Sequence, residues 1–261
     1  GLRLRGDPIF RASAGHDVIL AVGTRLAWPF NPDHLDGQQV VQIDIDAEEL
    51  GRNNYHNTIG IHGDARRTLE ELYAVLCEAG PAPASRLSEM ELMKADRLET
   101  ALRVEPLVSL LGAIRNAMPD DGILISGMTQ VGYYSRSNYP VYQPRTYLTS
   151  SYSGNLGYAY PLALGAKVAQ PDKAVVAVSG DGGFLYNSQE LATAVQYGIN
   201  AVVIVFNDNA FGNVLRDQIN LFDGRAIGAE LHNPDFVKLA EAYGARGVRA
   251  QGPDDLETSL R

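Results

Sequence analysis

Short runs of apolar residues, each ended by turn residues, recur along the chain and predict buried strands. The clearest runs span residues 174–179 and 201–206, and a shorter one spans residues 123–125. Apolar runs of this length are typical of parallel strands that are buried on both faces. Segments with helical periodicity separate them, at residues 156–169 and 189–197. This order predicts an α/β fold whose core is a doubly wound parallel sheet with helices on both faces.

An acidic residue follows each of the two clearest strands. Asp181 lies in a Gly-Asp-Gly turn, and Asp208 lies in an Asn-Asp-Asn turn. Ligands of open α/β sheets collect outside the carboxyl ends of the strands, so we expect the two carboxylates to meet in one crevice. Mg2+ takes a few protein oxygens and completes its shell with phosphate and water, while Gly182 and Gly183 let backbone N–H groups approach an anion. Either turn alone is typical of an ordinary strand end, but together they predict a Mg2+-bridged diphosphate site.

Turn residues at positions 80–85 interrupt the periodic pattern and indicate a boundary between domains. We therefore predict a first domain at residues 1–80, a linker at residues 81–104 and a second domain at residues 105–261. The charged stretch within the linker, residues 88–104, is typical of an exposed helix or a connecting segment.

Three further helices are predicted outside the central strands, at residues 65–78, 107–118 and 233–243. Cys77 lies in the apolar stripe of the first of these helices, so we expect it to be buried in a core. As the single cysteine of the chain, it cannot form an internal disulfide.

The composition limits the partners and the compartment. The chain has 261 residues, is 45% hydrophobic and carries a formal net charge of −9 without a Lys/Arg-rich stripe. Nucleic acid and acidic membrane surfaces are therefore not expected partners, because their phosphates would be repelled. The sequence contains neither an apolar run long enough to cross a bilayer nor a signal-peptide pattern at residues 1–10, which predicts a cytoplasmic protein.

The turns after the two strands resemble the cofactor motif of thiamine diphosphate enzymes of the acetolactate synthase and 2-oxo acid decarboxylase type. That motif is Gly-Asp-Gly followed, after an interval, by two Asn, and here the second Asn is replaced by Asp208. The replacement keeps an oxygen ligand and makes the site more negative. The resemblance implies that Asp181, Asp208 and the backbone oxygen of Ala210 ligate Mg2+. It also implies that Phe211 continues the cofactor-binding segment.

Other segments extend the resemblance to the rest of the cofactor. Residues 148–158 resemble the family segment that grips the aminopyrimidine ring, which implies that Gly154 offers a carbonyl group and that Leu156 supports the bent cofactor. Gln130 stands in the place of a residue in the family's second diphosphate-contacting loop. The same resemblance assigns the backbone of Gly182 and Gly183 to cofactor binding.

The first third of the chain resembles part of the family's central, Rossmann-like domain. The matching segments are residues 17–25 and 40–46, which correspond to two of its strands. Some relatives hold FAD in this domain. Residues 26–30 depart from the flavin-type continuation, so FAD is left open and is not favoured.

The resemblance implies a Mg2+- and thiamine diphosphate-dependent transferase or lyase that decarboxylates and carboligates pyruvate or a related 2-oxo acid. In this family ylid formation needs a glutamate on a pyrimidine-binding domain, which we do not find, so no catalytic residue is assigned in this chain. We expect that domain to come from the same or another chain, within a homodimer or homotetramer. The alternatives are an aryl or indole 2-oxo acid decarboxylase and a non-catalytic assembly subunit. A nicotinamide-dependent oxidoreductase is weaker, because the G-x-G-x-x-G fingerprint is absent near Gly23.

Overall fold

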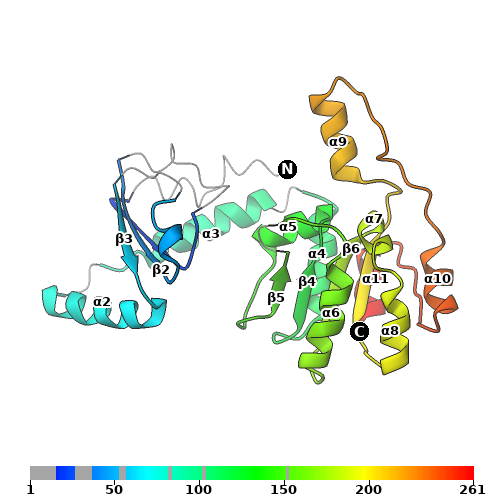
Figure 1. Cartoon of the computed structure of the whole chain (residues 1–261), viewed down its shortest axis with the longest axis horizontal. Helices are drawn as coiled ribbons and strands as arrows, with labels where there is room; N and C mark the ends of the chain where they lie inside the picture. The colour runs from blue at the N-terminus through cyan, green and yellow to red at the C-terminus, as the bar shows by residue number, and fades with distance from the viewer. Residues whose placement is uncertain (1–15, 27–36, 53–56, 82–83, 102–103, 151–152) are drawn as a thin grey trace. The chain divides into compact units, whose positions relative to one another are not determined.

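The computed structural model describes residues 16–26, 37–52, 57–81, 84–101, 104–150 and 153–261 (Figure 1). The chain forms two compact units, Leu2–Thr100 and Ala101–Arg261, with Gly1 grouped with the second. The division falls inside the segment 81–104 that the sequence predicts to be a linker. The two boundaries drawn from the sequence, at residues 80/81 and 104/105, remain a prediction.

The N-terminal unit contains a three-stranded parallel sheet in the order β1-β2-β3. Two of these strands match the segments expected from the sequence, and β3 was not predicted. The elements of this unit are β1 (Val18–Val22), β2 (Gln39–Asp44), the 3-10 helix η3 (Ala47–Glu49), β3 (Thr58–His62), α2 (Ala65–Ala79) and α3 (Leu87–Ala101). The segment predicted as an exposed helix or linker is therefore the helix α3.

Helix α2 corrects the expectation for Cys77. Asp64 caps the helix by accepting a hydrogen bond from the Arg67 backbone N–H at 3.0 Å, as its position before the helix suggests. Within the described residues, no side chain of α2 is buried, and Cys77 is exposed. The prediction of a core cysteine is wrong, because a regular apolar stripe fixes which face of a helix is apolar but not whether another element covers that face.

The C-terminal unit is built on a four-stranded parallel sheet in the order β5-β4-β6-β7. Its strands are β4 (Ile123–Ser126), β5 (Tyr147–Thr149), β6 (Val175–Gly180) and β7 (Val202–Phe206). The chain passes from β4 to β5 on one side and then returns to add β6 on the other side of β4. The order therefore reverses between β4 and β6, and such a switch point is where open α/β sheets form their binding crevice.

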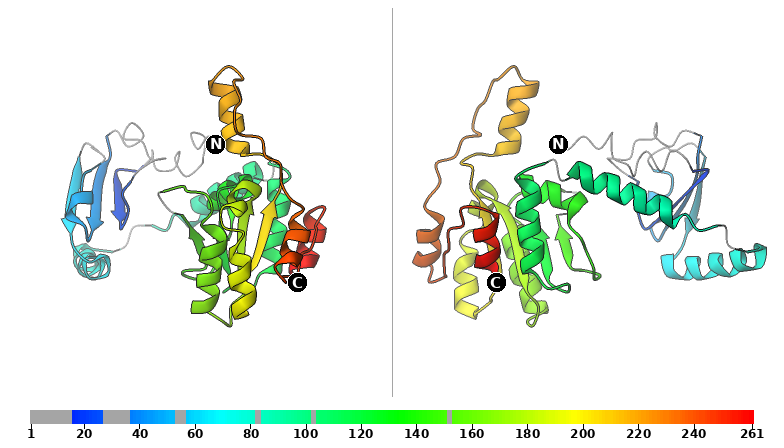
Figure 2. Two further views of the ribbon diagram at one scale, coloured as in Figure 1. Left: turned by 45° about the vertical axis from the view of Figure 1, so that its right-hand side comes forward. Right: turned by 180° about the vertical axis from the view of Figure 1, so that it is seen from behind.

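Helices cover both faces of this sheet, as the sequence predicts (Figure 2). Leu124 and Val178 point into a core shared with α4, α5 and α11, whereas Ile125 and Ala177 point to α6 on the other face. Successive side chains of each strand point to opposite faces of the sheet, and both faces are covered by apolar layers. The strands are therefore continuous apolar runs in the sequence. The helices are α4 (Leu107–Ala117), α5 (Gln130–Asn138), α6 (Ala159–Ala169), α7 (Asp181–Leu185), α8 (Glu190–Tyr197), α9 (Gly212–Leu221), α10 (Phe236–Ala242) and α11 (Pro253–Leu260).

Two local differences from the predicted elements bear on the site. Helix α6 begins at Ala159 rather than at Leu156, because Gly154 and Gly157 have φ values of +59° and +85° and hold the preceding segment as a loop. The sequence did not predict α9, which follows the Asp208 turn and buries none of its residues. Of the helices in the described ranges, none has the length and apolar character needed to cross a bilayer.

Candidate functional site

The loop after β4 lies directly against the strand end of β6. The Gly127 N–H donates to the Val178 carbonyl at 2.8 Å, and a Cβ at Gly127 would lie only 2.3 Å from that oxygen. Only glycine fits where two backbones approach this closely. The residues after β4 and β6 therefore form a single edge at the switch point of the sheet.

Asp181 is the first residue of α7 and is almost completely buried, with 1% of its surface exposed. One carboxylate oxygen accepts the Gly182 N–H at 2.8 Å, and the other accepts the side-chain N–H of Asn233 at 2.6 Å. Both donors are uncharged. Within the described residues, the charge of this buried carboxylate is therefore balanced by neither lysine nor arginine, which is an unfavourable arrangement without a cation.

Two further predicted residues lie against Gly182 and Gly183. A Cβ at Gly182 would lie 2.3 Å from the Phe211 ring, so this ring rests on the glycine backbone. A Cβ at Gly183 would meet Leu156 at 3.8 Å, an ordinary van der Waals distance. Phe211 and Leu156 thus flank the two glycines, although they come from different loops.

Asp208 lies in the exposed turn that follows β7. Burial of its carboxyl group, and then the negative charge of Asp181, raise the pKa of Asp208 above its usual range. The effect of Asp181 on Asp208 means that the two carboxylates are electrostatic neighbours, as their positions after adjacent strands predict. A Cβ at Gly212 would lie 2.8 Å from an oxygen of the Asp208 carboxylate, so any larger residue at the start of α9 would displace that carboxylate.

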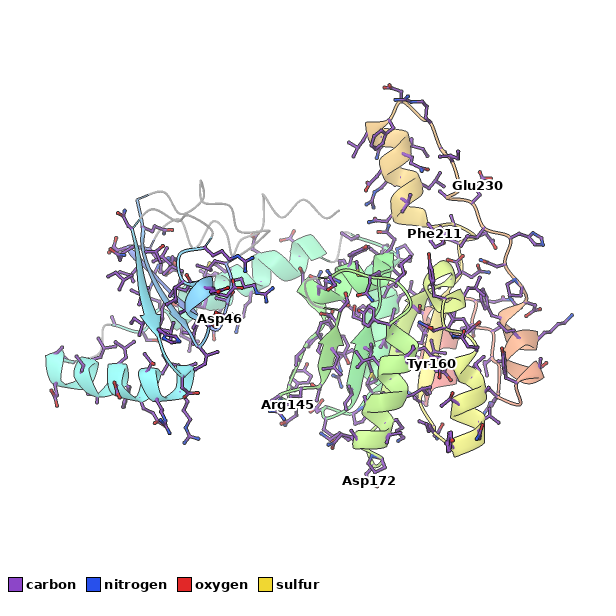
Figure 3. The ribbon with its side chains drawn as sticks, in the orientation of Figure 1. Asp46, Arg145, Tyr160, Asp172, Phe211 and Glu230 are labelled. Atoms are coloured by element: carbon purple, nitrogen blue, oxygen red, sulfur yellow. The ribbon has the colours of Figure 1, made fainter. Side chains whose placement is uncertain are left out.

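A short antiparallel bridge ties the turn after β7 to the segment before α10. The Phe211 N–H donates to the Ala229 carbonyl, and the Leu231 N–H donates to the Asn209 carbonyl, each at 2.8 Å. Ala210 pairs with Glu230 between these two bonds. Figure 3 labels Phe211 and Glu230 on the two segments. Neither bond of this bridge uses the Ala210 carbonyl oxygen, the group that the family resemblance implies as a metal ligand.

Asn233, which sequence reasoning treated only as the start of a helix, is part of this group. Its side-chain nitrogen lies 2.7 Å from the side-chain oxygen of Asn207 and 3.3 Å from that of Asn209, in addition to its bond with Asp181. The only signal in the sequence was an Asn-Pro-Asp turn, which is equally typical of any helix start. Its contacts with residues far away in the sequence could not be read from that turn.

Gln130 and Gly154 lie at the border of this group. Gln130 begins α5, and its side-chain nitrogen lies 3.4 Å from the Asn213 side-chain oxygen on α9. Gly154 is exposed, and a Cβ there would meet Met128 at 3.4 Å. Both therefore border the loop after β4 rather than Asp181 itself. Residues 151–152, inside the segment 148–158, lie outside the described residues.

The donor atoms gathered here suit a small hard cation. They are carboxylate, amide and backbone oxygens, which Mg2+ prefers over nitrogen or sulfur ligands. Among the described residues, no three His, Cys, Asp or Glu side chains converge, so a cation at this site would have to complete its shell with amide or backbone oxygens and a ligand. The buried, unbalanced Asp181 and the close-packed Gly182 fit a cation with an anionic ligand beside the glycine backbone.

The chain is similar to known proteins in both of its units. Residues 127–261 match the family described as "Thiamine pyrophosphate enzyme, C-terminal TPP binding domain", and residues 4–72 match the family described as "Thiamine pyrophosphate enzyme, central domain". The first match covers more than half of the chain.

Individual relatives differ in their described activities. The chain is 33% identical over its whole length to a protein described as a probable 2-ketoarginine decarboxylase of Pseudomonas aeruginosa, covering 47% of that protein. It is 32% identical to an acetolactate synthase large subunit of Haemophilus influenzae, over 94% of this chain and 44% of that one. A solved thiamine diphosphate-dependent 4-hydroxybenzoylformate decarboxylase of Rhodococcus jostii RHA1 superposes with a TM-score of 0.76 and 26% identity, over 97% of this chain and 47% of that one. The chain thus spans about half the length of these relatives.

Proposed function

The chain belongs to the thiamine pyrophosphate enzyme family, and on that basis we propose that it supplies the metal and diphosphate half of a site that decarboxylates a 2-oxo acid. The observation that supports this proposal is that the Asp181 carboxylate is buried against the Gly182 N–H and that its charge acts on Asp208, which follows the neighbouring strand. A buried carboxylate without a balancing cationic side chain is costly unless a cation joins it. A divalent ion that carries a diphosphate would remove this cost.

Each predicted residue has a task in this proposal. Asp181, Asp208 and the Ala210 carbonyl oxygen would hold Mg2+, while the N–H groups near Gly182 and Gly183 would face the diphosphate. Gln130 would reach the diphosphate from the start of α5. Gly154 and Leu156 would hold the ring system at the other end of the cofactor, and Phe211 would keep water from the glycine backbone.

The reaction itself would depend on the cofactor. Thiamine diphosphate, when bound, supplies the electron sink for the electrons released when a 2-oxo acid loses CO2. The residues of this chain would bind and orient the cofactor. Proton transfer would require a glutamate from a pyrimidine-binding domain that we propose to lie on the same or another chain, and we assign no catalytic residue here.

Two substrate classes follow from the relatives and stay separate until they are tested. Similarity to an acetolactate synthase supports pyruvate decarboxylation followed by carboligation, a transferase reaction. Similarity to decarboxylases of 2-ketoarginine and 4-hydroxybenzoylformate supports a lyase acting on a larger 2-oxo acid, including an aryl one. An inert assembly subunit is the third outcome of the same experiments.

We further propose a homodimer or homotetramer. Val214, Ile219 and Leu221 on α9 are at least half exposed, and burying such apolar side chains against a second copy would stabilise an oligomer. A nucleic-acid or membrane partner is not proposed, because the net charge is −9. The cytoplasmic location remains a prediction from the sequence, and FAD stays open and is not favoured.

Binding of the cofactor tests the site. We expect Asp181→Ala to abolish Mg2+-dependent binding of thiamine diphosphate in isothermal titration calorimetry, because it removes the buried ligand. Asp172→Ala is the matched control, since Asp172 is exposed and lies at the opposite end of the sheet from Phe211 (Figure 3). An unchanged affinity in Asp181→Ala would refute the assignment.

The products decide the reaction. The complete gene product, assembled with any chain that carries the pyrimidine-binding domain, would be incubated with Mg2+, thiamine diphosphate and either pyruvate or an aryl 2-oxo acid, and the products identified by mass spectrometry. A five-carbon hydroxy-oxo acid from pyruvate would support carboligation, whereas turnover of the aryl substrate alone would support the decarboxylase. Cofactor binding without turnover of either would support an assembly subunit.

A further inference from the structure

The side chain of Asn233 occupies an unusual position among oxygen atoms. Its nitrogen lies within 3.3 Å of three acceptors, which belong to Asp181, Asn207 and Asn209. An amide nitrogen carries only two hydrogens, so it satisfies two of these acceptors at a time. The two shorter contacts, with Asp181 and Asn207, are the hydrogen bonds that it serves.

The orientation of this amide follows from its neighbours. Exchanging its nitrogen and oxygen would place the oxygen against three other oxygens without a hydrogen between them, so only the observed orientation is chemically reasonable. In that orientation the Asn233 oxygen is buried without a hydrogen-bond partner in the described part of the chain. The Asn233 oxygen thus lacks a hydrogen bond, while the nitrogen of the same amide donates to Asp181 and to the turn at residues 207–209.

Asn233 also links parts of the chain that are distant in sequence. Asp181 follows β6 and lies 52 residues before Asn233, whereas Asn207 follows β7. The bridge between Asn209, Phe211 and the segment at Ala229 and Leu231 fixes the backbone two residues before Asn233. On the other side, Asp235 caps α10 by accepting the Val237 N–H at 3.0 Å. A side chain anchored on both sides can hold its partners at defined positions.

We propose that Asn233 is a positioning residue of the metal site, which holds the Asp181 carboxylate and the 207–209 turn in register before the cation binds. This inference rests on the function proposed above, because it concerns the same site. Asn233 orients Asp181 through one oxygen and leaves the carboxylate charge for the cation. Residues that hydrogen-bond to metal-binding carboxylates typically change metal affinity about 10–100-fold when they are removed.

Two substitutions separate the donor from its volume. Asn233→Ala removes both, whereas Asn233→Leu removes the donor and keeps a branched side chain of four heavy atoms, which fills at least the same volume. The control is Asn116→Ala, which removes a comparable amide-to-carboxylate bond, 3.2 Å long, between Asn116 and Glu257. Asn116 lies on α4 and its partner on α11, away from the strand ends that carry Asp181.

The readout is the affinity for Mn2+ in the presence of thiamine diphosphate, followed by the electron paramagnetic resonance signal of free Mn2+. Thermal melts with and without both ligands accompany it. We expect Asn233→Ala and Asn233→Leu to bind Mn2+ at least about tenfold more weakly, and to gain less melting temperature from the ligands. A residue with a merely structural role would lower both melting temperatures equally and leave the affinity unchanged.

The outcomes distinguish this inference from the proposed function. If the wild-type protein fails to bind Mn2+ with thiamine diphosphate, both are overturned. If the wild type binds and the two Asn233 variants bind equally well, only the positioning role is overturned. Wild-type affinity in Asn233→Leu, with a loss in Asn233→Ala, would assign the effect to side-chain volume and would overturn the role as a donor. A tenfold loss of Mn2+ affinity in the control Asn116→Ala would also overturn that role, because the effect would not be specific to the site.

Discussion

We expect Gly132→Ala, which adds a single methyl group, to displace the loop after β4 that borders the site. Gly132 is a buried residue in the first turn of α5, and a Cβ built there would lie 1.9 Å from the Gly127 carbonyl oxygen. Cβ atoms essentially never approach another heavy atom closer than 3.0 Å, so one of the two backbones must move by about 1.1 Å. Because the obstacle is backbone rather than the end of a flexible side chain, the strain cannot be relieved by a rotamer change.

The expected change in the free energy of unfolding is the sum of two unfavourable terms and one favourable term. Overpacking of this kind costs about 1–3 kcal/mol. Displacing Gly127 also disturbs the hydrogen bond that its carbonyl accepts from the Thr129 N–H, which adds about 1 kcal/mol. Alanine regains about 1 kcal/mol through its higher helix propensity. We therefore expect Gly132→Ala to lower the free energy of unfolding by about 1–3 kcal/mol.

The matched control is Gly165→Ala on α6. Gly165 is an exposed helical glycine with no atom within 4 Å of its added Cβ, so only the propensity gain remains. The same chemical change should therefore stabilise the protein by about 0.5–1 kcal/mol at this position. Urea unfolding followed by circular dichroism gives both values. Equal stability of the two variants would refute the backbone collision, and with it the close packing of α5 on the loop after β4.

Two further predictions concern titrating groups, and both are read from unfolding at different pH values. Burial and the charge of Asp181 raise the pKa of Asp208, so the folded, metal-free protein holds this proton more tightly than the unfolded chain does. The contribution of Asp208 to the free energy of unfolding is therefore present at low pH and is lost as pH rises through the raised pKa. Asp208→Asn should therefore stabilise the metal-free protein at neutral pH by less than about 1 kcal/mol, since the residue is exposed as a whole and its carboxyl group is only partly buried, while it weakens Mg2+ binding. A stabilisation that persists unchanged below pH 3.8, the ordinary value for aspartate, would contradict this reasoning. Burial, and then the charge of Glu190, raise the pKa of Tyr160 to about 12, so its contribution is present below pH 10 and is lost as pH rises toward 12. Wild type should lose up to about 2–3 kcal/mol more than Tyr160→Phe over this range, and ultraviolet titration that shows an ordinary phenol would contradict the expectation.

The fold of the C-terminal unit was largely predictable because its information is local. The apolar runs that form β4, β6 and β7 are continuous since both faces of each strand are covered. Prediction failed where an element depends on its surroundings. Strand β5 is only three residues long, too short for a strong periodic signal, and α9 buries none of its residues, so no core fixes its place in the unit.

The sequence by itself determined the parallel α/β architecture and the placement of Asp181 and Asp208 after neighbouring strands, because strand direction and the order of turns follow from patterns a few residues long. Only the tertiary structure decided which other groups join them. The Phe211 ring on Gly182, the amide of Asn233 between two strand ends and the exposure of Cys77 all depend on contacts, or on missing cover, between segments far apart in the chain. No local pattern encodes such contacts, since they arise from how the elements pack once each has formed.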